Sequence, residues 1–165
     1  MALIAAKMEP DAKAAIVEGL TQGLADTAVT TAKAQNFHWN VTGMAFGPLH
    51  ALFQEIYEDH FVGQDTLAER IKALDGHAEG RMAKWLERSS VEEHDGYATD
   101  EEMVQAMMKD QETLSSTMSA LASISEEHGD WATNDMAVAR VDVHDKFAWM
   151  LRVHLRDKPQ DNSGR

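Results

Sequence analysis

Four long stretches of helical periodicity constrain this chain more than any other feature of its sequence. Apolar residues recur every three or four positions over about 11–39, 47–74, 100–127 and 131–156. The strand-like alternation of apolar and polar residues is absent. Helices of roughly 25 residues bury such apolar stripes best against one another in a four-helix bundle. The 165 residues therefore predict one all-α domain, with a bundle over about 11–156 and flexible tails at 1–10 and 157–165.

The lengths of the links between these stretches predict how the helices are connected. Short links join the first helix to the second and the third to the fourth, which makes each pair antiparallel neighbours. The middle link, 75–98, is too long for a turn and suits a crossover along the bundle. Within it, the run MAKWLERSS predicts a short extra helix.

Two helix ends carry recognisable signals. Gly76 marks the end of the second helix, since glycine favours the backbone conformation that closes a helix. Thr99 is the predicted N-cap of the third helix, with Glu102 three residues later in capping-box position. His60 and His144 fall on apolar stripes, so we expect them to be core histidines with hydrogen-bond partners.

The charge of the chain limits its partners. The formal net charge is -13, which attracts cations and opposes unaided binding to nucleic acid. There is no cysteine, so disulfides and thiolate metal sites are excluded. No apolar run is long enough to span a membrane, and the first residues lack the features of a signal peptide. We therefore expect a cytoplasmic protein.

Two histidines and two carboxylates form a candidate ligand set. His38 and His50 flank a loop that contains glycine and proline, and Asp65 and Glu69 follow one helical turn apart. Such a set suits iron, and zinc accepts the same ligands. On one helix, however, His50 would lie roughly 22 Å from Asp65 and roughly 28 Å from Glu69. Either the residues are unrelated, or a second copy of the chain completes the site.

Helical geometry supports the second alternative. Positions 50, 54, 58, 61, 65 and 69 share one face of the second helix, away from its core stripe. Two copies packed antiparallel about a two-fold axis near 58–61 would place His50 of one opposite the carboxylates of the other. The alternative is a packed or capping His38 and a solvated acidic helix face. The Glu-x-x-His pattern of intrachain di-iron bundles is absent at all eight histidines.

Several motifs together resemble the Dps proteins, or miniferritins, of the ferritin-like superfamily. They are the run FHWNVTG, a second histidine twelve residues after the histidine of that run, the Asp65–Glu69–Arg70 spacing, and the runs GDWATND and DKFAWM. The resemblance covers about 11–156. It implies a ferritin-like bundle and a shell of twelve subunits that oxidises Fe(II), typically with hydrogen peroxide. The stored ferric mineral then protects against oxidative stress.

The resemblance also implies roles for individual residues. The two histidines would be catalytic metal ligands from one subunit, and the two carboxylates would come from its two-fold mate. Trp39 would lie beside the site and take up radical equivalents. Asp130 and Asp135 match acidic positions that line the three-fold pores through which iron enters.

The chain departs from the family pattern in two ways. Gln54 stands where the family often has Asp or Glu, so a second iron would be held loosely, and mineral nucleation would rely on Glu55 and Glu58. Neither tail is rich in lysine, unlike the tails of DNA-binding members, so DNA binding is not expected. Two other hypotheses stay open at this point, a DNA-compacting structural protein with incidental metal binding and a shell selective for zinc.

Overall fold

A computed structural model of the chain describes residues 8–95 and 97–155. This part of the chain contains helices and no strands. The helices are α2 (Pro10–Asn40), α3 (Phe46–Ala73), α4 (Met82–Arg88), α5 (Asp100–Glu127) and α6 (Trp131–His154). The predicted all-α class and short extra helix are thus confirmed. Of the predicted tails only residues 8–10 are described, and Arg156 also lies outside the described residues.

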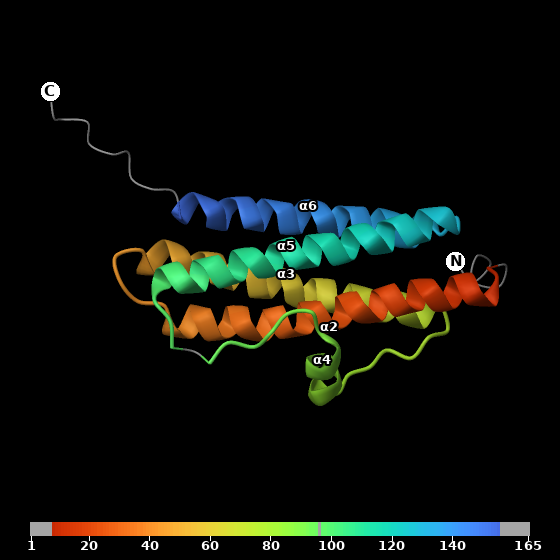
Figure 1. Cartoon of the computed structure of the whole chain (residues 1–165), viewed down its shortest axis with the longest axis horizontal. Coiled ribbons are helices and arrows are strands. Elements are labelled where there is room, and N and C mark those ends of the chain that lie inside the picture. The colour runs from red at the N-terminus through yellow and green to blue at the C-terminus, as the bar shows by residue number, and fades with distance from the viewer. Residues whose placement is uncertain (1–7, 96, 156–165) are drawn as a thin grey trace, which may run out of the picture.

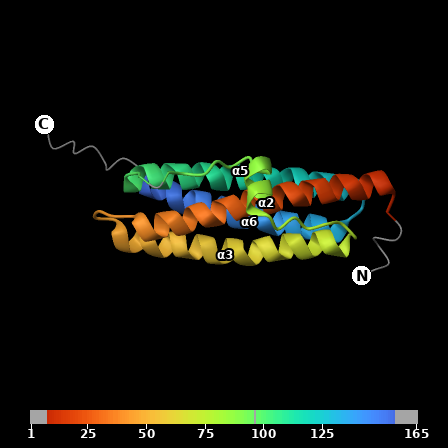
Figure 2. The same cartoon turned by 90° about the horizontal axis from the view of Figure 1, so that it is seen from below.

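The four long helices lie side by side along one axis (Figures 1 and 2). α2 packs against α3, and α5 packs against α6, each pair running antiparallel. The link 74–99 returns along the length of the bundle, so that α3 and α5 run in the same direction (Figure 1). α4 rests on the outside of α2 within this link. The predicted crossover is therefore confirmed.

None of the described helices combines the length and the apolar character that crossing a bilayer requires. The cytoplasmic location stays a prediction.

The predicted cap at the start of α5 is confirmed. The hydroxyl oxygen of Thr99 accepts a hydrogen bond from the backbone N–H of Glu102, and the carboxylate of Glu102 accepts one from the N–H of Thr99. These bonds satisfy backbone donors that the first turn of a helix leaves without partners.

The end of α3 differs in detail from the prediction. Asp75, not Gly76, adopts the left-handed conformation, with φ of 59°. The N–H groups of Asp75 and Gly76 donate to the carbonyl oxygens of Lys72 and Ile71, at 3.0 and 2.9 Å, which closes the last turn. Gly76 is still required, because a Cβ there would lie 2.8 Å from a methyl carbon of Ile71.

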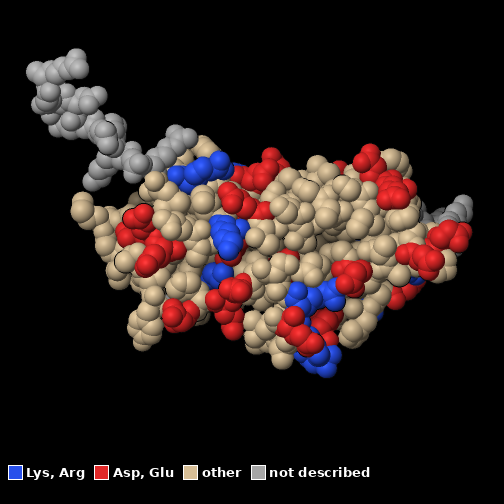
Figure 3. All heavy atoms as spheres, viewed as in Figure 1, with Lys and Arg blue, Asp and Glu red and all other residues tan. Residues whose placement is uncertain are grey.

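The core consists of two apolar clusters stacked along the bundle. One includes Phe37, Phe53 and Phe147, at the end where α2 turns into α3. The other includes Leu20 and Met118, towards the opposite end. Figure 3 shows the outside of the bundle, where Lys and Arg side chains appear in few places and most lie next to Asp and Glu.

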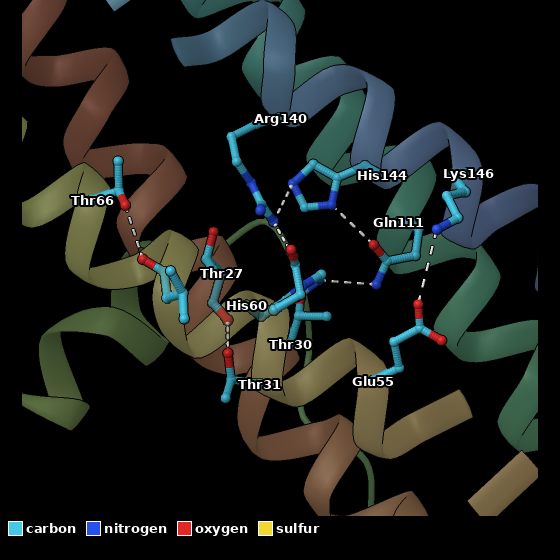
Figure 4. A network of polar contacts seen from close by, with 12 residues as sticks. Thr27, Thr30, Thr31, Glu55, His60, Thr66, Gln111, Arg140, His144 and Lys146 are labelled. Carbon is cyan, nitrogen blue, oxygen red and sulfur yellow. Dashed lines mark hydrogen bonds and ion pairs between the residues drawn. The ribbon is translucent and has the colours of Figure 1, made fainter. Parts of the chain in front are cut away.

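A buried polar ring joins α3, α5 and α6 inside the bundle (Figure 4). The Nδ1–H of His60 donates to Asp59 at 3.2 Å, and the side-chain amide of Gln111 donates to the Nε2 of His60 at 3.1 Å. The Nδ1–H of His144 donates to the Oε1 of Gln111 at 2.9 Å. Arg140 closes the ring by donating to Asp59 at 2.7 Å and facing the Nε2 of His144 at 3.5 Å. The predicted core histidines and their partners are therefore confirmed.

The polar ring is complete only when both histidines are neutral. Gln111 and Arg140 present N–H groups to the two Nε2 atoms, which must therefore accept. Burial lowers the pKa of His60 and lowers the pKa of His144 to about 2. Burial alone would raise the pKa of Asp59, but the hydrogen bonds from His60 and Arg140 outweigh burial and lower that pKa overall.

A second polar anchor holds the crossover against α2. Asp26 is fully buried, and its Oδ1 accepts hydrogen bonds from the Ser90 N–H at 2.7 Å and the Ser89 hydroxyl at 3.2 Å. Gln22 donates to the same oxygen, while Thr117 of α5 donates to Oδ2 at 3.0 Å. One carboxylate thus joins α2, α5 and the segment that follows α4.

The polar ring predicts how stability depends on pH. The folded pKa of His144 lies below that of an unfolded histidine, about 6.5, so acid protonates the unfolded chain first. The free energy of unfolding should therefore fall by about 1.4 kcal/mol per pH unit for this histidine as the pH drops below about 6.5. Urea unfolding followed by circular dichroism from pH 8 to pH 4.5 measures this slope. A His144→Gln variant should show a shallower slope than the wild type.

The control is His154→Gln, which removes an exposed histidine of the same helix and should keep the wild-type slope. Equal slopes for wild type and His144→Gln would contradict the assignment of a neutral, buried His144.

Candidate metal centre

His38 and His50 meet where α2 turns into α3. His38 lies in the last turn of α2 and His50 in the first turns of α3. The Nδ1 of each ring lies 2.8 Å from the backbone carbonyl oxygen of the other residue. The two rings are stacked, with centroids 3.7 Å apart and planes inclined by 21°.

These reciprocal contacts fix the tautomer of both rings. A carbonyl oxygen can only accept, so each Nδ1 carries the proton and each Nε2 carries the lone pair. Histidines that bind metals through one nitrogen commonly donate from the other to a carbonyl or carboxylate, which holds the ring in place. The pair therefore presents two oriented nitrogen donors to a divalent ion.

Aromatic rings surround the histidine pair on both sides. Phe46 stacks on His50 with centroids 5.0 Å apart, and Tyr57 meets the ring of His38 edge-on at 5.4 Å. Neither Phe46 nor Tyr57 was expected at the site from the sequence motifs. Tyr57 lies seven residues after His50, two helical turns, so this spacing was the available signal. Trp39 follows His38 directly, but its side chain is 70% exposed.

The two carboxylates lie far from the histidines of the same chain. α3 is unbroken from Phe46 to Ala73, so the roughly 22 Å between His50 and Asp65 along the helix stands. Asp65 and Glu69 are both exposed. Within residues 8–95 and 97–155, no three His, Asp or Glu side chains lie close enough to hold a metal. One chain thus brings together two of its four candidate ligands.

Asp65 faces an open groove between α3 and α4. The groove has a volume of about 420 Å³, and its walls include Phe61, Ala68 and Trp85. Phe61 is 69% exposed although it is large and apolar. The acidic end of the candidate ligand face thus lies beside uncovered apolar surface.

The residues after His50 are arranged as the helical periodicity indicates. Gln54 lies one turn after His50, on the same side of α3. Its amide nitrogen donates to the Oε1 of Glu58 at 2.7 Å. Its amide oxygen is the only group it can still offer to a cation. Glu55 is exposed and lies 3.9 Å from the ammonium group of Lys146. The proposed nucleation roles of Glu55 and Glu58 stay predictions.

Asp130 has a structural role within the chain, and its predicted pore role stays a prediction. Its side chain is fully buried, and it caps the start of α6 by accepting from the Thr133 N–H at 3.2 Å. It also pairs with Arg70 at 2.5 Å, and Arg70 donates to the Thr133 hydroxyl at 2.7 Å. The hydrogen bond from Arg70 lowers the pKa of Asp130 although burial opposes it. Asp130 therefore joins α6 to α3, whereas Asp135 is exposed. The pore roles of both residues stay predictions.

Three comparisons identify proteins to which the chain is similar. A family model of Ferritin, described as a ferritin-like domain, matches residues 17–160. The DNA protection during starvation protein 2 of Bacillus anthracis is 36% identical over 140 residues, which cover 85% of this chain and 96% of that protein. General stress protein 20U of Bacillus subtilis is 34% identical over 85% of this chain and 97% of its own length.

Solved structures show the same likeness. A Dps protein from Bacillus brevis superposes with a TM-score of 0.87 at 32% identity, over 90% of this chain and 100% of that one. A Dps protein from Vibrio cholerae, described as a member of a broad superfamily of ferritin-like diiron-carboxylate proteins, gives a TM-score of 0.86 at 26% identity. That match covers 90% of this chain and 94% of the other.

The structural role of Asp130 can be separated from a pore role by mutation. Asp130→Asn keeps a good N-cap residue but removes the charge that pairs with Arg70. We expect the free energy of unfolding, measured by urea titration, to fall by about 2 kcal/mol. Asp135→Asn, at an exposed position of the same helix, should leave stability unchanged. An Asp130→Asn protein of wild-type stability with slowed Fe(II) uptake would contradict the structural role and support the pore role instead.

Proposed function

Because the chain belongs to the Dps family of ferritin-like proteins, the miniferritins, we propose that it oxidises Fe(II) with hydrogen peroxide. The family assignment supports iron storage and protection as the general role. Ferroxidase chemistry, the choice of oxidant and a shell of twelve copies are the specific parts of the proposal. Zinc would compete for the same ligands.

The divided ligand set is the observation that carries this proposal. His38 and His50 present two oriented nitrogen donors at one end of α3, while Asp65 and Glu69 lie exposed towards its other end. Two antiparallel copies of α3, related by a two-fold axis near residues 58–61, would bring the histidines of one copy next to the carboxylates of the other. An isologous contact of this kind creates two identical sites per dimer.

The ligands account for both binding and oxidation of the substrate iron. Two carboxylates carry two negative charges, and anionic oxygen donors stabilise Fe(III) more than Fe(II). The carbonyl bonds of His38 and His50 hold the rings in position before iron arrives, so binding requires little rearrangement. Hydrogen peroxide takes two electrons and two protons to form two molecules of water. Two Fe(II) supply those electrons when the site is fully loaded.

The proposed path of iron starts and ends at exposed carboxylates. Asp135 would attract Fe(II) at a pore of the shell through its negative potential. After oxidation, Glu55 and Glu58 would receive ferric product on the face of α3 that carries the site. Trp39 would take up stray radical equivalents beside it.

A subunit-mixing experiment tests whether the site is shared between two chains. One variant carries His38→Ala and His50→Ala, and the other carries Asp65→Ala and Glu69→Ala. Each alone should lose most peroxide-dependent Fe(II) oxidation, because every site lacks half its ligands. After co-refolding, a mixed dimer has one site with all four ligands and one with none. Random pairing should then restore about a quarter of the wild-type rate if the sites act independently.

Each variant refolded alone provides the control, and mass spectrometry verifies that mixed dimers form. If verified mixed dimers recover no activity, the two halves of the site do not meet across a dimer. If the variants keep full activity before mixing, these four residues are not the ligands.

Compaction of DNA is the competing function, and the names of several relatives refer to DNA protection. The net charge of -13 per chain opposes it, since DNA binding requires cations that replace the counterions of phosphate. We expect no retardation of linear DNA at physiological salt and neutral pH in a gel-shift assay without added divalent cation. Retardation that weakens as salt rises would favour the DNA-compacting function instead.

A further inference from the structure

A cavity lies between α2 and α4, away from the histidine pair and the carboxylates. Its volume is about 180 Å³. Its apolar lining consists of short side chains from α2 and longer ones from α4, namely Ala28, Val29, Ala32, Met82, Trp85 and Leu86. No residue of α4 is buried, so the short helix forms a roof over the cavity and does not fill it.

Hydrogen bonds fix the chain on both sides of this roof. Before α4, the carbonyl oxygen of Glu79 accepts a hydrogen bond from the indole N–H of Trp85 at 2.7 Å. After α4, the Ser90 N–H donates to the buried carboxylate of Asp26 at 2.7 Å. These bonds hold α4 in position above α2, so the cavity is a built feature of the fold.

The size of the cavity matches one ring. An engineered protein cavity of roughly 150 Å³ with aliphatic and aromatic walls binds benzene. The cavity beneath α4 is slightly larger and has mostly apolar walls. A six-membered ring with one small polar substituent therefore fits it.

A buried ammonium group determines the polar end of the cavity. Lys33 lines the cavity, although its side chain is only 6% exposed, and its Nζ lies 2.7 Å from the Oδ2 of Asp110. Within residues 8–95 and 97–155, no other acceptor bonds to this ammonium. An ammonium carries three N–H donors, and a buried donor without an acceptor costs free energy. Lys33 can therefore donate to an oxygen atom of a ligand.

The charges around the cavity favour a neutral ligand over an anion. Lys33 and Asp110 balance each other, and Glu93 adds an exposed carboxylate to the lining. Burial raises the pKa of Asp110 to about 6, so this carboxyl is ionised at pH 8. The other polar residues of the lining are Asn36 and His94. Two carboxylates would repel an anionic ligand, whereas a carbonyl oxygen accepts from Lys33 without adding charge.

We propose that this cavity binds an uncharged single-ring compound that carries a carbonyl or amide oxygen. The ring occupies the apolar space between α2 and α4, and the oxygen accepts a hydrogen bond from the ammonium of Lys33. None of the proposed iron ligands lines the cavity. The inference therefore stands or falls independently of the proposed ferroxidase function.

Ligand-detected NMR titrations of the assembled, metal-free protein at pH 8 test this site. The three probes share a phenyl ring: benzamide is neutral with an acceptor oxygen, toluene has no acceptor, and benzoate is an anion. We expect benzamide to bind most tightly. Toluene should bind about tenfold more weakly, because it cannot accept from the charged donor. Benzoate should also bind more weakly than benzamide, because two carboxylates repel it.

Two variants locate the bound probe. Ala32→Phe places a phenyl ring in the cavity and should abolish binding of benzamide and toluene. Ala83→Phe makes the same change at an exposed alanine of α4 outside the lining, and it should leave binding unchanged. Lys33→Met combined with Asp110→Leu replaces the buried ion pair by apolar side chains, a change that proteins often tolerate. This double variant should bind toluene as the wild type does and lose the preference for benzamide.

Four outcomes would overturn the inference. They are no binding of any probe at millimolar concentration, equal affinity of the wild type for benzamide and toluene, tightest binding of benzoate, and unchanged binding in Ala32→Phe. Circular dichroism verifies that each variant is folded. If the double variant does not fold, the order of the three affinities in the wild type still decides whether Lys33 donates to the ligand.

Discussion

The buried polar ring is the interaction that fixes the alignment of the helices. Apolar side chains tolerate small sliding movements, because dispersion contacts have little directionality. The polar ring does not tolerate such sliding, because each donor on α3, α5 and α6 must stay within hydrogen-bond distance of its acceptor in a low-dielectric interior. Gly63 permits the arrangement, because a Cβ there would lie 2.9 Å from the guanidinium carbon of Arg140.

Alignment of α2 with α3 determines what the chain can bind. The last turn of α2 lies level with the first turns of α3, so two imidazoles stack and each donates to the other's carbonyl. The unbroken α3 then acts as a rigid spacer that keeps Asp65 and Glu69 away from them. In the proposed function this spacer makes iron oxidation depend on assembly, because a lone chain offers only half of each ligand set.

Much of the fold was predictable because helix formation is governed by local patterns. The capping box at Thr99 and the burial of His60 and His144 follow from residue spacing alone, and the structure confirms them. The ion pair between Asp130 and Arg70 was not predictable, since no local pattern indicates a partner sixty residues away. Asp75 adopts the left-handed backbone conformation that the preference for glycine assigned to Gly76.

The sequence by itself determined the four long helices, the crossover and the separation of the histidines from the carboxylates along α3. These properties depend on periodicity, link length and rise per residue, all of which are local or one-dimensional. Only the tertiary structure decided the tautomers of His38 and His50 and the contact between Tyr57 and His38. Contacts between helices depend on their relative rotation and alignment, which the packing of the whole bundle sets and no single segment encodes.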